Sequence, residues 1–315
     1  MNVNMISIII NTKNSAQTIE NTLKSIESLV DDLSGEIVIM DMGSTDETLK
    51  IVRKFRAKVF SFEGEGSFVE VARNAALKKA VNDWVLVIDS DEEIKPDLGG
   101  LIKKIILNKE LPIGVEQADG YFLVRENIIF NYSFKATGWY PDFQLRLFKR
   151  KLVNWPAIIH SIPEITGKTF RLPSEKKEWA LIHHNYATIS QFWQRADRYS
   201  SIQTTEKEIE KHKLVQYLSD QFWGEFWRRF FQSEGWKDGA HGMVLALFQA
   251  NVELMAATKV WQECGFFEQK LTIKEWQRIW NNWQRSFNYW RANCLVNNSD
   301  GFVKIFWKIR RKFKF

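Results

Sequence analysis

The chain has 315 residues, of which 45% are hydrophobic, with 6 prolines and 16 glycines, a composition that excludes disordered, collagen-like and low-complexity proteins. At this length we expect one large α/β domain and a smaller appendage. The 44 lysines and arginines exceed the 38 aspartates and glutamates by six, and residues 301–315 contain six basic residues and no acidic one. The excess positive charge therefore lies in the tail.

The first half of the chain alternates short apolar runs with helical patterns. We predict strands at Ile6 to Ile10, Glu36 to Met40, Lys58 to Phe62 and Trp84 to Ile88. Helices are predicted at Ala16 to Val30, Asp46 to Phe55, Phe68 to Val81 and Pro96 to Leu107. Because the strands are apolar throughout, the alternation predicts a mostly parallel sheet with helices on both faces. Ligands bind such sheets at the carboxyl ends of the strands.

The second half begins with shorter strands and ends in helices. Strands are predicted at Gly120 to Arg125, Phe143 to Lys149 and Trp179 to His183. Helices are predicted at Ile189 to Glu210, Tyr217 to Gln232, Gly239 to Gln262 and Ile273 to Asn293. We therefore expect a catalytic domain at 1–188, a helical region at 189–300 and a basic tail at 301–315.

Three features of the sequence indicate in which cellular compartment the protein works. The two cysteines, Cys264 and Cys294, have no metal-binding spacing, which favours a reducing environment. The apolar run from Met5 lacks the basic flank and cleavage site of a signal peptide, so we expect no export. Polar residues interrupt the longest apolar stretch, Gly242 to Val260, so we expect no membrane-spanning helix.

Carboxylates follow two of the predicted strands. The run Asp89-Ser90-Asp91-Glu92-Glu93 follows the fourth strand and offers the oxygen ligands that Mg²⁺ or Mn²⁺ prefers, with a diphosphate completing the shell. The run from Asp41 to Asp46 follows the second strand, and polar residues at 11–14 end the first. Capping of the next helix is the simpler interpretation of either run. Arg73 could bind a phosphate or these carboxylates. The alternative is that Arg73 is a solvated charge on a helix.

Four motifs resemble the family 2 glycosyltransferases in order and spacing. They are NTKN at 11–14, DMGSTDET at 41–48, ARNAAL at 72–77 and DWVLVIDSDEEI at 83–94. GWYPDFQLRLFKR at 138–150 and LIHHNY at 181–186 are most similar to the bacterial group of lipopolysaccharide-core β-1,4-glucosyltransferases. The resemblance covers about the first 190 residues. It implies the GT-A fold, a Rossmann-like α/β architecture, followed here by the helical region.

The resemblance also implies roles for individual residues. It assigns the nucleotide sugar to Thr12, Asn14, Asp41, Ser44, Arg73, Asp89 and Arg146, with Asp41 at the uracil and Arg146 at a phosphate. Asp91 would bind the Mn²⁺ or Mg²⁺, and His183 would help to hold the metal or diphosphate. Asp142 would be the general base of an inverting transfer. The roles of His160 and Glu164 stay open, because Ser-Ile-Pro separates them where the relatives have His-Glu directly.

The expected activity is transfer of a hexose from a nucleotide sugar, UDP-glucose being the first candidate, to a hydroxyl of an envelope, lipid-linked or polysaccharide acceptor. A non-catalytic GT-A scaffold or sugar-nucleotide sensor at the membrane is the alternative. A sugar nucleotidyltransferase is disfavoured, because the first strand is not followed by a glycine-rich basic loop.

The tail has the pattern of an interfacial amphipathic helix. Phe302, Ile305, Phe306, Ile309 and Phe313 fall at helical spacing between the six basic residues. We expect binding to an anionic membrane surface and a cytoplasmic protein, peripheral on the inner face of the cell membrane. Nucleic-acid binding is disfavoured, since the rest of the chain has no basic excess. A solvated C-terminal helix is the remaining alternative.

Overall fold

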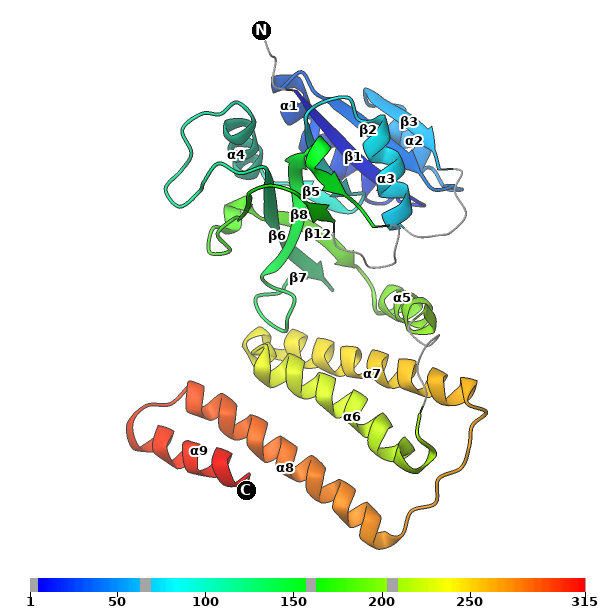
Figure 1. The fold of residues 1–315 in the computed structure, drawn as a ribbon, viewed down its shortest axis with the longest axis vertical. Coiled ribbons are helices and arrows are strands. Elements are labelled where there is room, and N and C mark those ends of the chain that lie inside the picture. Colours follow the sequence, from blue (N-terminus) through cyan, green and yellow to red (C-terminus); the bar gives the residue numbers. More distant parts are fainter. Residues whose placement is uncertain (1–4, 63–68, 157–162, 203–208, 315) are drawn as a thin grey trace. The chain divides into compact units, whose positions relative to one another are not determined.

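The computed structural model describes residues 5–62, 69–156, 163–202 and 209–314 (Figure 1). The chain divides into two compact units. Unit 1 comprises Met1–Ile128 and Pro141–Asn185, and unit 2 comprises Ile129–Tyr140 and Tyr186–Phe315. The predicted boundary after residue 188 had left the segment 129–140 in the catalytic domain, whereas in the structure this segment packs with the helices.

The main sheet has the strand order β3-β2-β1-β4-β8-β6-β12-β5. Its strands are β1 (Ile6–Thr12), β2 (Glu36–Asp41), β3 (Ala57–Ser61), β4 (Trp84–Asp89), β5 (Glu92–Ile94), β6 (Gly120–Ile129), β8 (Asp142–Lys149) and β12 (Leu181–Tyr186). Shorter strands are β7 (Tyr132–Ser133), β9 (Val153–Asn154), β10 (Glu164–Ile165) and β11 (Thr169–Arg171).

The predicted GT-A-like α/β fold with a helical C-terminal region is confirmed, and only part of its sheet is parallel. β3, β2, β1 and β4 pair in parallel, as the βα alternation indicated. β8 runs antiparallel to both β4 and β6, and β12 antiparallel to β5. The described connection from β6 to β8 contains no crossover helix, and a parallel pair would need one. The sheet is therefore mixed.

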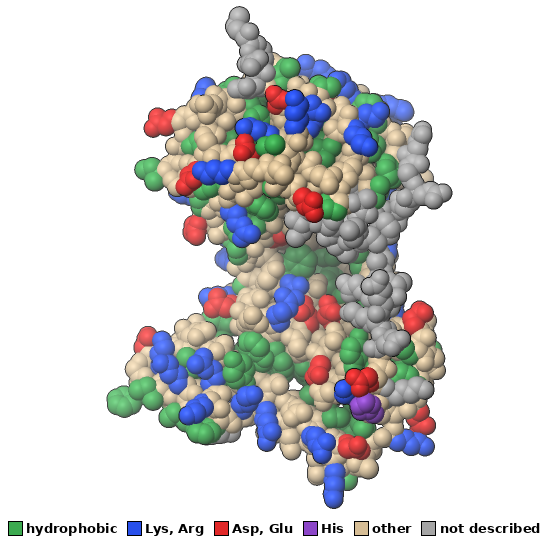
Figure 2. All heavy atoms as spheres, viewed as in Figure 1, with side chains coloured by type: hydrophobic (Ala, Val, Ile, Leu, Met, Phe, Trp, Pro, Cys, Tyr) green, Lys and Arg blue, Asp and Glu red, His purple; other side chains and the backbone are tan. Residues whose placement is uncertain are grey.

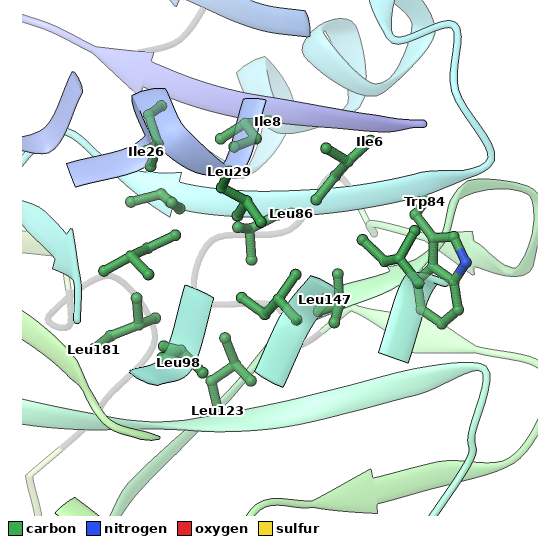
Figure 3. Close-up of a cluster of buried hydrophobic side chains, with 14 of the residues drawn as sticks. Ile6, Ile8, Ile26, Leu29, Trp84, Leu86, Leu98, Leu123, Leu147 and Leu181 are labelled. Atoms are coloured by element: carbon green, nitrogen blue, oxygen red, sulfur yellow. The ribbon is translucent and has the colours of Figure 1, made fainter. Parts of the chain in front are cut away.

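Helices cover both faces of the sheet. The helices of unit 1 are α1 (Ile19–Asp32), α2 (Thr48–Val52), α3 (Val69–Lys79) and α4 (Pro96–Ile106), each within a predicted helical segment or nearly so. On one face, Ile8 and Leu86 pack in a cluster with α1 and α4 residues such as Ile26 and Leu98 (Figure 3). On the other, Ile9 packs with α3 residues including Ala76. Successive residues of β1 thus face opposite layers, which explains its continuous apolar run.

Unit 2 is helical. It contains α5 (Ile189–Ile202), α6 (Leu214–Trp227), α7 (Gly239–Glu263), α8 (Ile273–Asn297) and α9 (Gly301–Phe313). α8 begins at a capping box in which Thr272 and Glu275 each bond the other's backbone N–H. Segment 129–140 is attached by the buried Asp238, whose carboxylate accepts hydrogen bonds from the backbone N–H groups of Lys135 and Ala136, both at 3.0 Å.

Among the described residues, one helix has the length and hydropathy of a membrane span, Gly235–Glu263. This differs from the expectation that its polar residues would disqualify the stretch. Mostly buried helices of a soluble core pass the same criterion, whereas 33% of the apolar window is buried here, where α7 packs against α5 and α6 through residues such as Leu245 and Ala250.

Candidate functional site

Three parallel strands bring polar residues to one edge of the sheet. Thr12 at the end of β1 pairs in register with Asp41 at the end of β2. Asn11 pairs on its other side with Asp89 at the end of β4. The predicted convergence of these strand ends is therefore present, and it follows from the parallel register of adjacent strands.

The turn after β2 holds the Asp41 carboxylate in place. Asp41 is buried and accepts hydrogen bonds at 3.2 Å from the backbone N–H groups of Gly43 and Ser44. Gly43 has φ +83°, a conformation that favours glycine. Asn14 is tied to the same turn, because its N–H donates to Ser44 Oγ at 3.0 Å and its Oδ1 accepts from Thr45 N–H at 2.8 Å. Four predicted nucleotide-binding residues thus lie together at this corner: Thr12, Asn14, Asp41 and Ser44.

Asn11 and Thr12 carry buried polar atoms with no hydrogen-bond partner among the described residues. Both side-chain atoms of the Asn11 amide and Oγ1 of Thr12 are in this state, although Asn11 is only 7% exposed. Burying such groups without a partner costs about 1–3 kcal/mol each, so a polar ligand at this corner would offset the cost. Asn11 was not singled out from the sequence, where nothing distinguished it from its neighbours in the NTKN run.

Asp89 is bound by two arginines. Its Oδ1 accepts from Arg73 Nη2 at 2.6 Å and its Oδ2 from Arg146 Nη2 at 2.5 Å. Burial alone would raise the pKa of Asp89, but the charges of Arg146 and Arg73 outweigh burial and hold that pKa well below its usual range. Arg73 thus binds a carboxylate, which is one of the two partners considered for it, and this carboxylate belongs to Asp89 at the end of β4.

Glu92 is a buried carboxylate that the sequence did not single out. It is 0% exposed, and its Oε1 lies 2.7 Å from Arg146 Nη2 and 3.6 Å from Arg125 Nη1. Arg146, predicted to bind phosphate, is itself only 2% exposed and is engaged by Asp89 and Glu92. A buried charge is tolerated when it is paired, so these residues support one another.

Asp91 and His183, the two predicted metal ligands, lie side by side. His183 Nε2 is 3.6 Å from Asp91 Oδ1. The pairing of β5 with β12 produces this contact, because His183 is in register with Glu92, the residue after Asp91. No group of three or more His, Cys, Asp or Glu side chains that could hold a metal occurs in the described part of the chain. The donor set fits a hard cation that takes two protein ligands and fills its shell with phosphate and water.

Asp142, the predicted general base, begins β8 and is partly buried. Its Oδ2 accepts from Arg125 Nη2 at 2.6 Å and from Asn127 Nδ2 at 3.1 Å, while its Oδ1 accepts from Gln144 Nε2 at 2.9 Å. Burial would raise the pKa of Asp142, but the charge of Arg125 and the hydrogen bonds lower it below its usual value. Asp142 is therefore ionised at neutral pH, as a proton acceptor must be.

Glu164 and His160 are the remaining candidates. Glu164 is exposed in β10, which pairs with β9 in a separate two-stranded sheet. His160 lies outside the described residues. A hollow of about 420 Å³ at the opposite end of β4, lined by residues that include Trp84 and Lys149, contains none of the predicted site residues.

The comparisons with known proteins found one family model and several relatives described as glycosyltransferases. The model described as glycosyl transferase family 2 matches residues 7–162. A glycosyltransferase of Rickettsia conorii, described as uncharacterized, is 25% identical over 275 residues, covering 81% of this chain and 89% of the relative. The poly(ribitol-phosphate) β-N-acetylglucosaminyltransferase TarS of Staphylococcus aureus is 36% identical over 96 residues, covering 29% of this chain and 17% of TarS.

Solved structures match this chain with TM-scores below 0.5. Glucosyl-3-phosphoglycerate synthase from Mycobacterium tuberculosis, solved with Mn²⁺, UDP and phosphoglyceric acid, is 30% identical, with a TM-score of 0.31, over 34% of this chain and 40% of that structure. Staphylococcus aureus TarS is 18% identical, with a TM-score of 0.38, over 98% of this chain and 88% of that structure.

Proposed function

We propose that this chain, whose residues 7–162 match the model of glycosyl transferase family 2 and which has the GT-A fold, is an inverting, metal-dependent hexosyltransferase that uses a UDP-sugar. UDP-glucose is the first candidate donor. A hydroxyl of an envelope, lipid-linked or polysaccharide glycan is the proposed acceptor. The observation that carries the proposal is the grouping of the predicted donor and metal residues at one sheet edge, with Asp142 joined to His183 through Asn127.

The corner formed by β1 and β2 is proposed to bind the nucleobase. Uracil presents an N–H flanked by two carbonyl groups, so it needs one acceptor and two donors. Asp41 supplies an acceptor, while the buried polar atoms of Asn11 and Thr12 supply groups that have no partner among the described residues. Asp89 would face the ribose, and Arg73 and Arg146 would hold its carboxylate in the ionised form.

Asp91 and His183 are proposed to hold Mn²⁺ or Mg²⁺ together with the diphosphate. The cation would neutralise charge on the departing nucleoside diphosphate. Asp91 and His183 are near enough to share one ion, and the lack of a third described protein ligand leaves positions for phosphate oxygens.

Asp142 is proposed to remove the proton of the acceptor hydroxyl. Oδ2 is held by Arg125 and Asn127, whereas Oδ1 receives one hydrogen bond from the described part of the chain, donated by Gln144. Oδ1 therefore retains lone-pair capacity for the incoming hydroxyl. As its proton passes to Oδ1, the acceptor oxygen bonds to the anomeric carbon, and the bond from that carbon to the phosphate oxygen breaks on the opposite face.

The direct test of this function is a donor screen. Purified protein with Mn²⁺ is incubated with a panel of nucleotide sugars, while thermal shift and release of nucleoside diphosphate are followed. UDP-glucose should raise the melting temperature in the presence of Mn²⁺, since a ligand that binds only the folded state stabilises it, and UDP should be released. Binding of a nucleotide sugar without any release of UDP would favour the non-catalytic sensor instead.

We further propose that α9 attaches the protein to an anionic membrane surface. In a soluble protein the apolar stripe of an amphipathic helix faces the core. In α9 that stripe faces outward: Phe302 is 90% exposed, and Ile305, Phe306, Ile309 and Phe313 are also exposed. The side toward α8 instead holds Arg311, which donates to Asn293 at 2.9 Å, and Trp307, which contacts Arg291. α9 lies beside α8 in Figure 1, and Figure 2 shows hydrophobic and basic side chains interspersed there.

A matched pair of variants tests this attachment. Replacing Lys304, Lys308 and Lys312 with glutamine should weaken partitioning onto anionic vesicles by about 100-fold, because each basic residue contributes about 1 kcal/mol at such a surface. Replacing Phe302 and Phe306 with serine should weaken partitioning onto both anionic and neutral vesicles, because the apolar contribution does not depend on lipid charge. Ile113→Ser removes a fully exposed apolar side chain from unit 1 and should change nothing. Unchanged sedimentation of both α9 variants with anionic vesicles would place the attachment elsewhere.

A further inference from the structure

Asn127 connects the proposed general base to the proposed metal ligand. It lies on β6 and is 0% exposed. Its Nδ2 donates to Asp142 Oδ2 at 3.1 Å, and its Oδ1 lies 2.6 Å from His183 Nδ1. A buried asparagine in a strand is often no more than a satisfied core residue. Because its two partners are Asp142 and His183, Asn127 can influence the proposed metal ligand.

The direction of these hydrogen bonds is fixed by chemistry. Asp142 is ionised, and an ionised carboxylate only accepts hydrogen bonds, so the NH₂ group of Asn127 must face it. The amide oxygen of Asn127 then faces His183, and an oxygen can only accept. His183 Nδ1 must therefore carry a hydrogen, which leaves the lone pair of neutral His183 on Nε2.

The other side of the His183 ring faces Asp91. Nε2 is 3.6 Å from Asp91 Oδ1. In this tautomer a nitrogen lone pair and a carboxylate oxygen approach each other, and this repulsion is relieved when a metal cation or a proton lies between them. The opposite tautomer would carry a hydrogen on Nε2 and would donate it to Asp91, closing the same pair of atoms to a metal ion.

We infer that Asn127 is a positioning residue that holds His183 in the Nδ1–H tautomer, so that the Nε2 lone pair is directed toward Asp91 and both groups can serve as ligands of a divalent cation. The role of the cation rests on the proposed function, whereas the tautomer does not. Asn127 touches neither donor nor acceptor in this arrangement. It acts through His183, and its second bond ties the same network to Asp142.

The tautomer is measured on the full-length protein without metal or donor. The protein contains 5 histidines, and ¹⁵N-histidine labelling with a His183→Gln variant assigns the signals of His183. The pH is raised until the ¹⁵N shifts of the ring no longer change, and the nitrogen that carries the hydrogen in the neutral ring is then read directly from those shifts. The wild-type protein should show a hydrogen on Nδ1 and none on Nε2.

Two substitutions of similar size separate positioning from packing. Asn127→Leu removes the acceptor, so the hydrogen of His183 should move to Nε2, and affinity for UDP with Mn²⁺ should fall by about 10- to 100-fold, the usual effect of losing an outer partner of a metal ligand. Asn127→Asp keeps an oxygen opposite Nδ1 and should keep the tautomer, with its other oxygen carrying a proton toward Asp142 Oδ2, because two ionised carboxylates at that distance repel each other. Asn82→Ala, which removes a buried asparagine bonded to the Ile6 carbonyl at the far end of β1, controls for destabilisation alone and should leave both readouts unchanged.

The outcomes are distinct. If Asn127→Leu leaves the hydrogen on Nδ1, or if the wild-type ring carries it on Nε2, the inference is overturned. If the tautomer moves as expected in Asn127→Leu but no variant, including wild type, binds UDP with Mn²⁺, the positioning of His183 is supported and the proposed function fails.

Discussion

Replacing Asp142 with asparagine should lower the turnover number by about 10²- to 10⁴-fold, the usual contribution of a general base. The side chain keeps its size, but the amide has no basic site of useful strength at neutral pH. Affinity for the nucleotide sugar should change little, because the proposed donor residues lie at the ends of β1, β2 and β4, while Asp142 begins β8. Steady-state kinetics with a saturating donor, together with calorimetry of UDP binding, measures both effects.

Asp119→Asn is the matched control for this prediction. Asp119 is also an aspartate in an ion pair, with Lys149 at 2.7 Å, but it lies at the opposite end of β8 from Asp142. Its replacement should leave turnover unchanged. A turnover number in Asp142→Asn equal to that of wild type would remove Asp142 from the role of base, whichever donor proves to be correct.

Replacing Asp91 with alanine should abolish the contribution of Mn²⁺ to UDP binding. Loss of an outer partner typically costs 10- to 100-fold in metal affinity, so loss of the ligand itself should cost about 100-fold or more. Calorimetric titration of UDP with and without Mn²⁺ gives the comparison. Wild type should bind UDP more tightly when Mn²⁺ is present, whereas the variant should show the same affinity in both conditions.

Glu93→Gln is the control for the loss of a nearby carboxylate. Glu93 is two residues from Asp91, but it pairs with His184 Nε2 at 2.8 Å rather than with His183. The control variant should keep the Mn²⁺ dependence of UDP binding. Equal UDP affinity with and without Mn²⁺ in the wild-type protein would instead show that the donor is bound without a metal.

The sequence by itself determined the parts that depend on local pattern. Continuous apolar runs predicted β1, β2 and β4, and the residues that end them, Thr12, Asp41 and Asp89, lie at one edge because parallel strands share their direction. The alternation of apolar and basic residues predicted the helix α9. These features were readable because each depends on residues that are close together in the chain.

Only the tertiary structure decided which groups meet across long separations. The three-residue strand β5 was too short to show a period, yet its pairing with β12 brings His183 to Asp91. The partners of Arg146 and Asn127 are likewise set by strands that become neighbours only in the folded sheet. The reason is that burial leaves a charge or an amide dependent on whichever opposite group the fold places beside it, and no local spacing in the sequence records that choice.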